Sequence, residues 1–277
     1  MSSAPLLIVD GDNLAHRAYH STPKTVLGAD GKVINAVVGF FGMLLNLWTQ
    51  ESPRQCFVAW DTLGTDTYRN RLWPAYQTGR VFEPDIVRQL DLLPEICRAF
   101  AFGVAKQAGC EADDLMASAA KAEVRQGGAA LLYTTDRDAY QLVNEQITVL
   151  SPRRGSPVPD RIGPREVVER FGVLPQQVCD FKALSGDASD KIPGVRGIGP
   201  KSAAALLLKH GSLDAILPTL QRPEDAKAAM LFREVVCMQD EIKVALPSSA
   251  PEWKRGAEVL RALGAERSAE RAAEFAA

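Results

Sequence analysis

The chain has 277 residues, of which 46% are hydrophobic and 24% are charged, as in globular proteins with one large domain or a core and a smaller appendage. No apolar run approaches the ~20 residues of a membrane helix, and Met1–Pro5 lacks the basic flank of a signal peptide, so we expect a cytoplasmic protein without a membrane partner. The net charge of −2 excludes a uniformly basic nucleic-acid binder, but acidic pockets and basic stripes can cancel in such a sum.

The first 150 residues alternate between predicted strands and predicted helices. Apolar runs predict strands at 6–10, 55–60, 104–106 and 129–134, and periodic segments predict helices at 33–48, 83–100 and 111–126. This alternation predicts an α/β domain with a mostly parallel sheet flanked by helices. Between the second strand and the second helix, the segment from about 64 to 83 loses its periodicity and becomes rich in Arg, Tyr, Gly and Thr.

The second half is predicted to be helical. The proline-rich segment 151–164 predicts a hairpin and connector, and no convincing strand follows Pro164. Helices are expected near 164–171, 177–184, 200–210 and 213–220, and the tail after Pro247 is expected to be an amphipathic helix that frays toward Ala277. We therefore divide the chain into a core at 1–160 and a helical subdomain at 161–277.

Acidic residues follow the predicted strands or begin the predicted helices. They are Asp10, Asp61, Glu111, Asp113, Asp114, Asp136, Asp138, Asp187 and Asp190. Ligands of parallel sheets gather at the carboxyl ends of the strands, so several of these side chains are expected to converge. Converging carboxylates repel one another unless a cation neutralises them, and Mg²⁺ prefers such oxygen ligands. The pattern predicts a site with two or more Mg²⁺ ions, for which Mn²⁺ can substitute.

Each of these acids also has a simpler interpretation. An aspartate after a strand often caps a helix or forms a turn, and acids in a first helical turn complement the helix dipole. Capping does not predict that four separate segments carry acids at the same edge of a sheet, so we favour the metal site. The three histidines are too scattered for a zinc site, and the five cysteines show no metal-type spacing.

A glycine-rich string, "SDKIPGVRGIGPKSAAALLLKHGS" at 189–212, predicts a tight turn followed by a helix. Gly194, Gly197 and Gly199 permit the turn, Pro200 occupies the first helical position, and Lys201 and Ser202 lie in the first turn. Amides at a helix N-terminus beside a lysine bind phosphate, so we expect a helix–hairpin–helix over 189–210 that binds the DNA backbone. Basic residues within and after this turn would supply the missing positive patch: Lys191, Arg196, Lys201 and Lys209.

Taken together, these motifs resemble the 5′ nuclease family, which includes the 5′-3′ exonuclease domain of bacterial DNA polymerase I and the flap endonucleases. The matching strings, in order, are IVDG, AWD, PAYQTGR, GCEADD, TTDRDAYQL and SGDASDKIPGVRGIGPKSA. The resemblance runs from about Leu6 to beyond Leu220. It implies a nuclease core of the PIN type followed by a helical DNA-binding subdomain.

The resemblance also implies roles for individual residues. One metal would lie around Asp10, Asp61, Glu111 and Asp113, and a second around Asp136, Asp138, Asp187 and Asp190, with Asp114 close by. Arg69, Tyr76 and Arg80 match the family segment that forms an arch over a single strand. Arg17 matches a basic residue that faces the scissile phosphate. The glycine turn would bind the downstream duplex together with a K⁺ ion.

The chain departs from the family pattern in three places. Gln77 stands where the arch usually has lysine, and Lys191 stands where asparagine is common. No polymerase domain follows before Ala277, so we expect a stand-alone relative. Without the arch lysine, we expect this protein to be a slow member of its family.

We therefore predict a monomeric, magnesium-dependent hydrolase that cuts DNA at 5′ ends and 5′ flaps. One alternative is a non-catalytic protein that binds DNA junctions, although relatives of that kind would have lost acids that this chain keeps. A second alternative is a PIN-like ribonuclease, which would share the acidic sheet edge but not the glycine turn.

Overall fold

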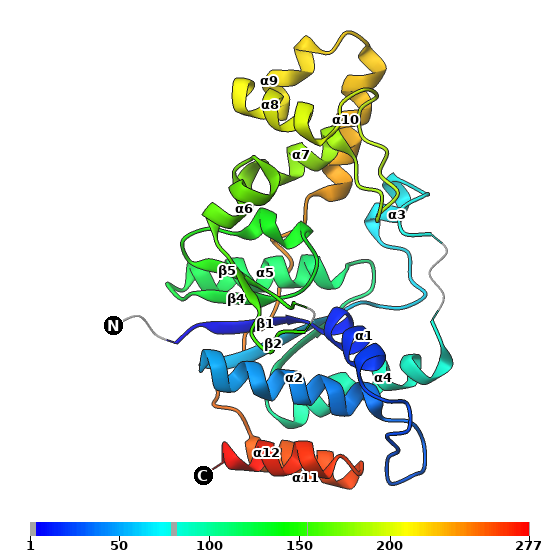
Figure 1. The fold of residues 1–277 in the computed structure, drawn as a ribbon, viewed down its shortest axis with the longest axis vertical. Coiled ribbons are helices and arrows are strands. Elements are labelled where there is room, and N and C mark those ends of the chain that lie inside the picture. Colours follow the sequence, from blue (N-terminus) through cyan, green and yellow to red (C-terminus); the bar gives the residue numbers. More distant parts are fainter. Residues whose placement is uncertain (1–3, 79–81, 154, 277) are drawn as a thin grey trace.

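Six strands form one sheet at the centre of the computed structural model, which describes residues 4–78, 82–153 and 155–276 (Figure 1). Their spatial order is β3-β2-β1-β4-β5-β6, and only the β5–β6 pair is antiparallel. The strands are β1 (Leu6–Asp10), β2 (Gln55–Trp60), β3 (Gly103–Lys106), β4 (Ala130–Tyr133), β5 (Ile147–Ser151) and β6 (Asp160–Ile162). The mostly parallel α/β prediction is confirmed, and the predicted hairpin around 151–164 is the β5–β6 connection.

The central strands are apolar on both faces because helices cover both sides of the sheet. Every residue of β1 and β2 is buried, as expected for interior strands of a parallel sheet. In register, Asp10 pairs with Ala59 of β2, and Val9 pairs with Tyr133 of β4. The chain therefore leaves these three neighbouring strands at one edge of the sheet, and the residues that follow each strand meet there.

Two layers of helices enclose the sheet. One face packs against α1 (Gly11–Ser21), α2 (Asn35–Glu51) and α4 (Pro84–Ala99), and the other face packs against α5 (Ala112–Arg125) (Figure 1). Alternate residues of β1 divide between these layers: Leu7 belongs to the core shared with α2, and Ile8 belongs to the core shared with α5.

A helical unit lies beyond α5, at the top of the molecule in Figure 1. It contains α6 (Pro164–Phe171), η2 (Pro175–Gln177), α7 (Val178–Ser185), α8 (Pro200–His210), α9 (Leu213–Ile216), η3 (Leu217–Thr219) and α10 (Pro223–Val236). Two further short helices, α3 (Tyr68–Leu72) and η1 (Asp138–Leu142), connect the core with this unit. The Arg69 side chain of α3 donates to the carbonyl of Val235 in α10 over 2.9 Å.

An extended segment, 237–252, returns the chain from the helical unit to the core. Its backbone runs along α5, where Gln239 N donates to Asp114 Oδ1 over 2.9 Å and Ile242 N donates to Ser118 Oγ over 3.1 Å. Farther along, its Pro247 ring packs against Gly103 at the start of β3, where a Cβ would lie 2.9 Å from the proline Cδ.

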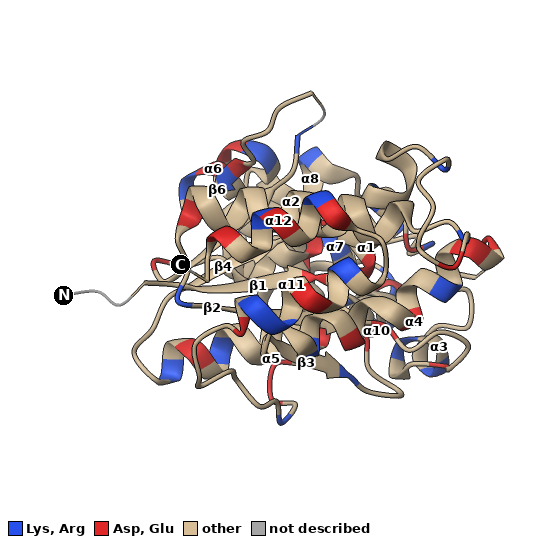
Figure 2. Cartoon of the chain, turned by 90° about the horizontal axis from the view of Figure 1, so that it is seen from below, with Lys and Arg blue, Asp and Glu red and all other residues tan. Residues whose placement is uncertain are grey.

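The C-terminal helices lie on the core. The predicted helical subdomain of 161–277 was therefore too long, because its last part belongs to the core. The tail forms α11 (Trp253–Ala262) and α12 (Glu266–Glu274), which pack below α2 and α4 (Figure 1). The reason is apolar burial, since Trp253 meets Trp48 with ring centroids 4.7 Å apart and also packs on Phe102. Seen from below, α11 and α12 carry Lys, Arg, Asp and Glu of both signs (Figure 2). Within the described residues, none of the helices has the length and apolarity needed to cross a bilayer.

Candidate active site

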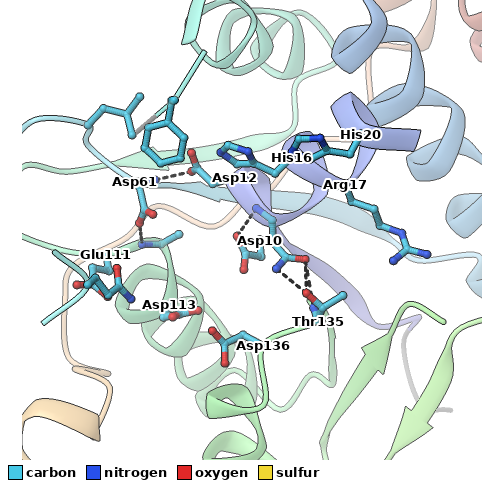
Figure 3. A pocket seen from close by; sticks show the side chains of 15 residues that line it. Asp10, Asp12, His16, Arg17, His20, Asp61, Glu111, Asp113, Thr135 and Asp136 are labelled. Atoms are coloured by element: carbon cyan, nitrogen blue, oxygen red, sulfur yellow. Dashed lines mark hydrogen bonds between the residues drawn. The ribbon is translucent and has the colours of Figure 1, made fainter. Parts of the chain in front are cut away.

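Acidic side chains from four segments line one pocket at the carboxyl edge of the sheet (Figure 3). The cavity has a volume of about 540 Å³. We call Asp10, Asp61, Glu111 and Asp113 the first acidic group; all four line this pocket, as does Asp136. The predicted convergence of acids from separate strand ends is therefore observed.

The turn from β1 into α1 places Asp10. Asp10 is the N-cap of α1, with its Oδ1 accepting from Asn13 N over 3.0 Å, and its Oδ2 accepts from the Thr134 hydroxyl over 2.9 Å. The next residue has to be glycine, because a Cβ on Gly11 would lie 2.6 Å from the ring of Trp60. The capping interpretation is thus correct for one oxygen of Asp10, while the side chain also faces the pocket.

Backbone amides hold the acids that follow β2 and β3. Asp61 Oδ1 accepts from the amide of Ala112 over 2.7 Å, so the end of β2 is fixed to the start of α5. The amide of Asp61 donates in turn to Asp12 Oδ2 over 2.7 Å. Because α5 begins at this point, its first turn directs Glu111 and Asp113 into the same pocket (Figure 3).

The electrostatics of the first acidic group favour a bound cation. Burial, together with the neighbouring Asp61 and Asp136, raises the pKa of Asp10 to about 7. Burial and the nearby Asp136 and Asp10 raise the pKa of Asp113 well above its ordinary value. Asp113 Oδ1 is buried without a hydrogen-bond partner among the described residues, so an oxygen atom remains available to a hard cation.

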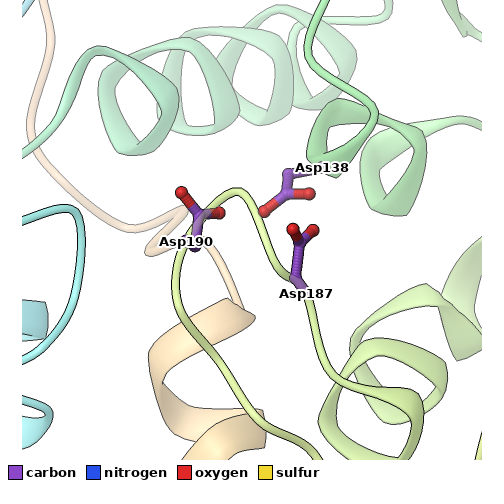
Figure 4. A group of neighbouring side chains, drawn as sticks. All are labelled: Asp138, Asp187 and Asp190. Atoms are coloured by element: carbon purple, nitrogen blue, oxygen red, sulfur yellow. The ribbon is translucent and has the colours of Figure 1, made fainter.

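A second cluster of acids lies between η1 and the loop after α7 (Figure 4). We call Asp138, Asp187 and Asp190 the second acidic group; one oxygen of each lies within 4.8 Å of the others. Lys182 contributes a cation here, because its Nζ lies 2.6 Å from Asp187 Oδ2 and also contacts Asp138 Oδ1. Burial would raise the pKa of Asp187, but hydrogen bonds from Lys182 and Ser189 outweigh it, and the pKa is lowered.

Asp136 lies between the two acidic groups. It lines the pocket of the first group and also a neighbouring cavity that Lys182 and Asp187 line. The charge of Asp136 helps to raise the pKa values of both Asp113 and Asp190, after burial as the main cause. The resemblance assigns Asp136 to the second metal, and the geometry makes it a neighbour of both groups.

Arg69 and Asp114 do not face the pocket, which corrects two sequence-based assignments. Arg69 Nη1 and Nη2 each donate to one oxygen of Asp114 over 2.7 Å, and both residues are buried. Asp114 also accepts from the amides of Glu111 and Gln239. Both side chains are thus occupied in a bidentate ion pair that joins α3 to α5, which leaves neither free for a phosphate or a metal.

The remaining arch residues lie beside the acids. Buried Tyr76 donates its hydroxyl to Glu111 Oε2 over 3.0 Å. Gln77 Nε2 donates to Asp190 Oδ1 over 3.0 Å and to the hydroxyl of Tyr76 over 2.9 Å. Gln77 therefore links the arch segment to the second acidic group, and Arg80 lies outside the described residues.

Arg17 extends from α1 away from the carboxylates, as Figure 3 shows. Its Nη2 donates to the carbonyl of Arg153, in the β5–β6 connection, over 3.3 Å. Arg17 still lines the edge of the pocket, so a role beside a phosphate requires its side chain to turn.

The glycine-rich string forms the turn that its composition predicts. Gly194 has φ +69°, and a Cβ there would lie 2.3 Å from the amide of Gly186, so this turn packs backbone against backbone. Gly199 differs, since its φ is −90° and no atom lies within 4 Å of the place where a Cβ would be. Internal packing therefore does not require glycine at 199, whereas close approach of an external group would.

The basic residues near this turn are exposed, with Arg196 and Gly197 in the turn and Lys201 and Ser202 in the first turn of α8. Lys191 is exposed too, but its Nζ donates to the carbonyl and hydroxyl oxygens of Thr78, at 2.6 and 2.8 Å. Lys191 thus faces the arch segment.

Two residues of the site were not among the predicted ones. Asp12 was visible in the string Asp10-Gly11-Asp12, and its place two residues after a strand-end acid was the available signal. Burial and Asp61 raise the pKa of Asp12 well above its ordinary value. Lys182 gave no comparable signal, because a lysine within a short apolar helix usually extends to solvent.

Comparison with known proteins gives two matching family models. The 5′-3′ exonuclease N-terminal resolvase-like domain matches residues 5–172, and the 5′-3′ exonuclease C-terminal SAM fold matches residues 173–254. DNA polymerase I of Mycobacterium tuberculosis is 39% identical over 214 residues, which are 76% of this chain and 24% of that protein. The thermostable DNA polymerase I of Thermus thermophilus is 37% identical over 225 residues, 80% of this chain and 26% of its own length.

The chain thus spans about a quarter of the length of these curated relatives. Among solved structures, the bacteriophage T5 D15 flap endonuclease, determined with DNA and metal ions, has the same fold. It superposes with a TM-score of 0.68 at 21% identity, covering 98% of each chain.

Proposed function

Because this chain belongs to the 5′-3′ exonuclease family, we propose that it hydrolyses phosphodiester bonds of DNA at 5′ ends and 5′ flaps. The reaction would use two or more Mg²⁺ ions, for which Mn²⁺ can substitute, and the protein would act as a monomer on branched DNA. The match to the longer relatives covers about a quarter of their length, and the two matching family models are both 5′-3′ exonuclease domains.

One observation carries the proposal: carboxylates from four chain segments surround one open pocket, and the buried Oδ1 atom of Asp113 has no partner within the described residues. Such a cluster is costly without a cation, because each added negative charge raises the pKa of its neighbours. The donor set, with only oxygen atoms, suits Mg²⁺ better than zinc. Asp10, Asp61, Glu111 and Asp113 would hold one ion, and the second acidic group with Asp136 would hold another.

Bound Mg²⁺ would supply Lewis acidity, which lowers the pKa of water and neutralises charge on the phosphate. The residues of this chain would position the reactants around it. Thr134 and the amide of Ala112 orient the ligands Asp10 and Asp61, and Tyr76 and Thr67 orient Glu111. Arg17, after turning from the Arg153 carbonyl, would stabilise charge on the phosphoryl oxygens.

The glycine-rich turn would bind the DNA backbone at a distance from the acids. The free amides at the start of α8 and the exposed Lys201 and Arg196 provide the groups that bind phosphate without reading sequence. The open space at Gly199 supports this assignment, because a side chain there would block a phosphate. Binding of K⁺ by carbonyls of this turn stays a prediction.

The test is cleavage of one labelled 5′-flap DNA in Mg²⁺ and in EDTA. Wild-type protein should cut near the junction only with the metal, and Asp10→Ala should lower single-turnover cleavage by more than ~100-fold while duplex binding persists. Asp91→Ala is a matched control, since Asp91 is an exposed acid of α4 outside the pocket. Near-wild-type turnover by Asp10→Ala would exclude this metal site.

The same assay separates the alternatives. A ribonuclease would cut an RNA flap in preference to the DNA flap, and a non-catalytic binding protein would bind both substrates and cut neither.

A further inference from the structure

Lys182 is the cation of the second acidic group, and it is almost completely buried. It lies on α7 and is 6% exposed. Its Nζ lies 2.6 Å from Asp187 Oδ2 and also contacts Asp138 Oδ1, so it bridges two of the three acids. The third acid, Asp190, accepts from Gln77 Nε2 over 3.0 Å.

These three acids have the spacing of a metal site, with one oxygen of each within 4.8 Å of the others. A Mg²⁺ ion binds carboxylate oxygens at roughly 2.0–2.1 Å. An ammonium group that donates to Asp187 and contacts Asp138 would lie only a few ångströms from such an ion. Two positive centres that close repel strongly in a buried site, so the ion and the bridging lysine cannot both be accommodated well.

Among the residues that the structure describes, the first acidic group has no equivalent lysine. Within the described residues, Arg69 reaches Glu111 at 3.5 Å, and no lysine or arginine forms an ion pair with Asp10, Asp61 or Asp113. The two groups would therefore differ in their affinity for free cations, although both consist of aspartate and glutamate.

We propose that Lys182 is an internal counter-ion which occupies the second cation site and must release Asp138 or Asp187 before a second divalent cation binds. The proposal rests on the proposed metal-dependent function. It predicts that free protein fills the first acidic group first, and that the second group binds its ion weakly because Lys182 has to be displaced.

The structure provides a place for the displaced side chain. Lys182 and Asp187 line a cavity of about 540 Å³ that also reaches Asp136 and Ser189. A phosphate entering this cavity would give the released ammonium a new anionic partner. Nucleic acid should then strengthen binding of the second ion. The phosphate gives the displaced ammonium a new partner, and the ion gives the released carboxylates one, so each ligand favours binding of the other.

The experiment is a Mn²⁺ titration of the full chain. Binding is measured by calorimetry and, independently, from the electron paramagnetic resonance signal of free Mn²⁺. Wild-type protein should bind one ion tightly and a second more weakly. Lys182→Met and the hydrogen-bonding variant Lys182→Gln should each bind the second ion at least about tenfold more tightly, with the first unchanged.

Lys121→Met is the matched control, because Lys121 also bridges two acids, Asp240 and Glu241, at 2.7 and 2.8 Å. Those acids lie on the return segment, away from the pocket, so this variant should leave both Mn²⁺ affinities unchanged.

A measurement on wild-type protein does not depend on a variant folding. In ¹⁵N spectra of the lysine ammonium groups, the Lys182 signal should change with the second equivalent of Mg²⁺ and not with the first. An unchanged signal through both equivalents, or an unchanged second affinity in both Lys182 variants, would overturn the proposal. If wild-type protein binds no ion even at the first group, the proposed function fails instead.

Discussion

The two acidic groups solve the same electrostatic problem in different ways. In the first group, carboxylates at two strand ends and the start of α5 face one another with little opposing charge, and the pKa of Asp10 rises to about 7. In the second group, Lys182 bridges two acids, and the pKa of Asp187 falls. Similar residues thus give one group without a bridging ammonium among the described residues and another that contains one.

This difference shows that a count of acids does not predict metal affinity. An acid in the first group gains stability from protonation or from an external ion, whereas Asp138 and Asp187 gain it from an ammonium within the same chain. The predictions below test this contrast.

The largest effect is expected from Lys182→Met in EDTA. Removing this cation leaves buried carboxylates uncompensated, which should lower the free energy of unfolding by about 3–5 kcal/mol. Urea denaturation in EDTA and in saturating Mg²⁺ would measure it. The deficit should shrink in Mg²⁺, because an ion can then take the place of the ammonium; a deficit independent of Mg²⁺ would mean that Lys182 serves packing alone.

The second prediction concerns pH in the absence of metal. Asp10 has a pKa of about 7 in the folded chain against 3.8 ordinarily, so the native state binds the extra proton between these values. Its contribution to stability is therefore present below about pH 4 and is lost as pH rises through 7. In EDTA, this carboxyl should give a falling slope of at most about 1.4 kcal/mol per pH unit.

The control is Asp10→Asn, which cannot titrate and should flatten the fall. Asp187 has the opposite sign, because its lowered pKa gives stability that is lost as pH falls below its ordinary value of 3.8. A stability in EDTA that rises from pH 4 to 7 in wild-type protein would contradict this account of the first group.

A third prediction concerns a region that neither acidic group should influence. Lys201→Ala should weaken binding to all duplex sequences about equally and lower the salt slope by roughly one unit. Gly199→Val should weaken binding further by filling the open space where a phosphate would approach. Fluorescence anisotropy in EDTA at several salt concentrations would measure both, and loss that depends on DNA sequence would mean that the turn does not act as a backbone clamp.

The smallest effect is expected from Gln77→Lys. A lysine at this position would bring a cation to the arch segment, where it could stabilise charge on the phosphate in the transition state. We expect a several-fold rise in single-turnover cleavage with little change in affinity. Gln77 contacts Asp190, however, so the new lysine could instead act as a second counter-ion for the second acidic group.

Rates on the same flap at low and high Mg²⁺ distinguish these outcomes. A faster rate at saturating Mg²⁺ supports the phosphate role. A rate equal to or below that of wild type would show that Gln77 is already compensated and that the predicted slowness is wrong.

The sequence predicted the features that depend on neighbours along the chain. The strand ends at Asp10 and Asp61 and the glycine turn at 194 were visible because strand, turn and helix signals are local. Features that depend on distant partners were not. Arg69 matched an arch residue, and only the fold shows that Asp114, 45 positions later, removes it from the surface. Lys182 was missed for the same reason, since its partner Asp138 belongs to another element.

The tail was misplaced because its apolar face did not specify a partner. The sequence predicted an amphipathic helix there. Whether its apolar face packs on the helical unit or on the core depended on Trp48 and Phe102, about 200 and 150 positions before Trp253.

The return segment 237–252 has a consequence for the order in which the protein is made. The helical unit is an insertion, since the chain leaves the core after β6 and re-enters it with α11 and α12. A ribosome therefore completes the entire helical unit before it delivers the helices that cover Trp48 and Phe102. Until then the nascent core exposes aromatic surface, and a fragment ending at 236 would retain that exposure permanently. The helices α11 and α12 therefore protect aromatic residues that are synthesised well before them.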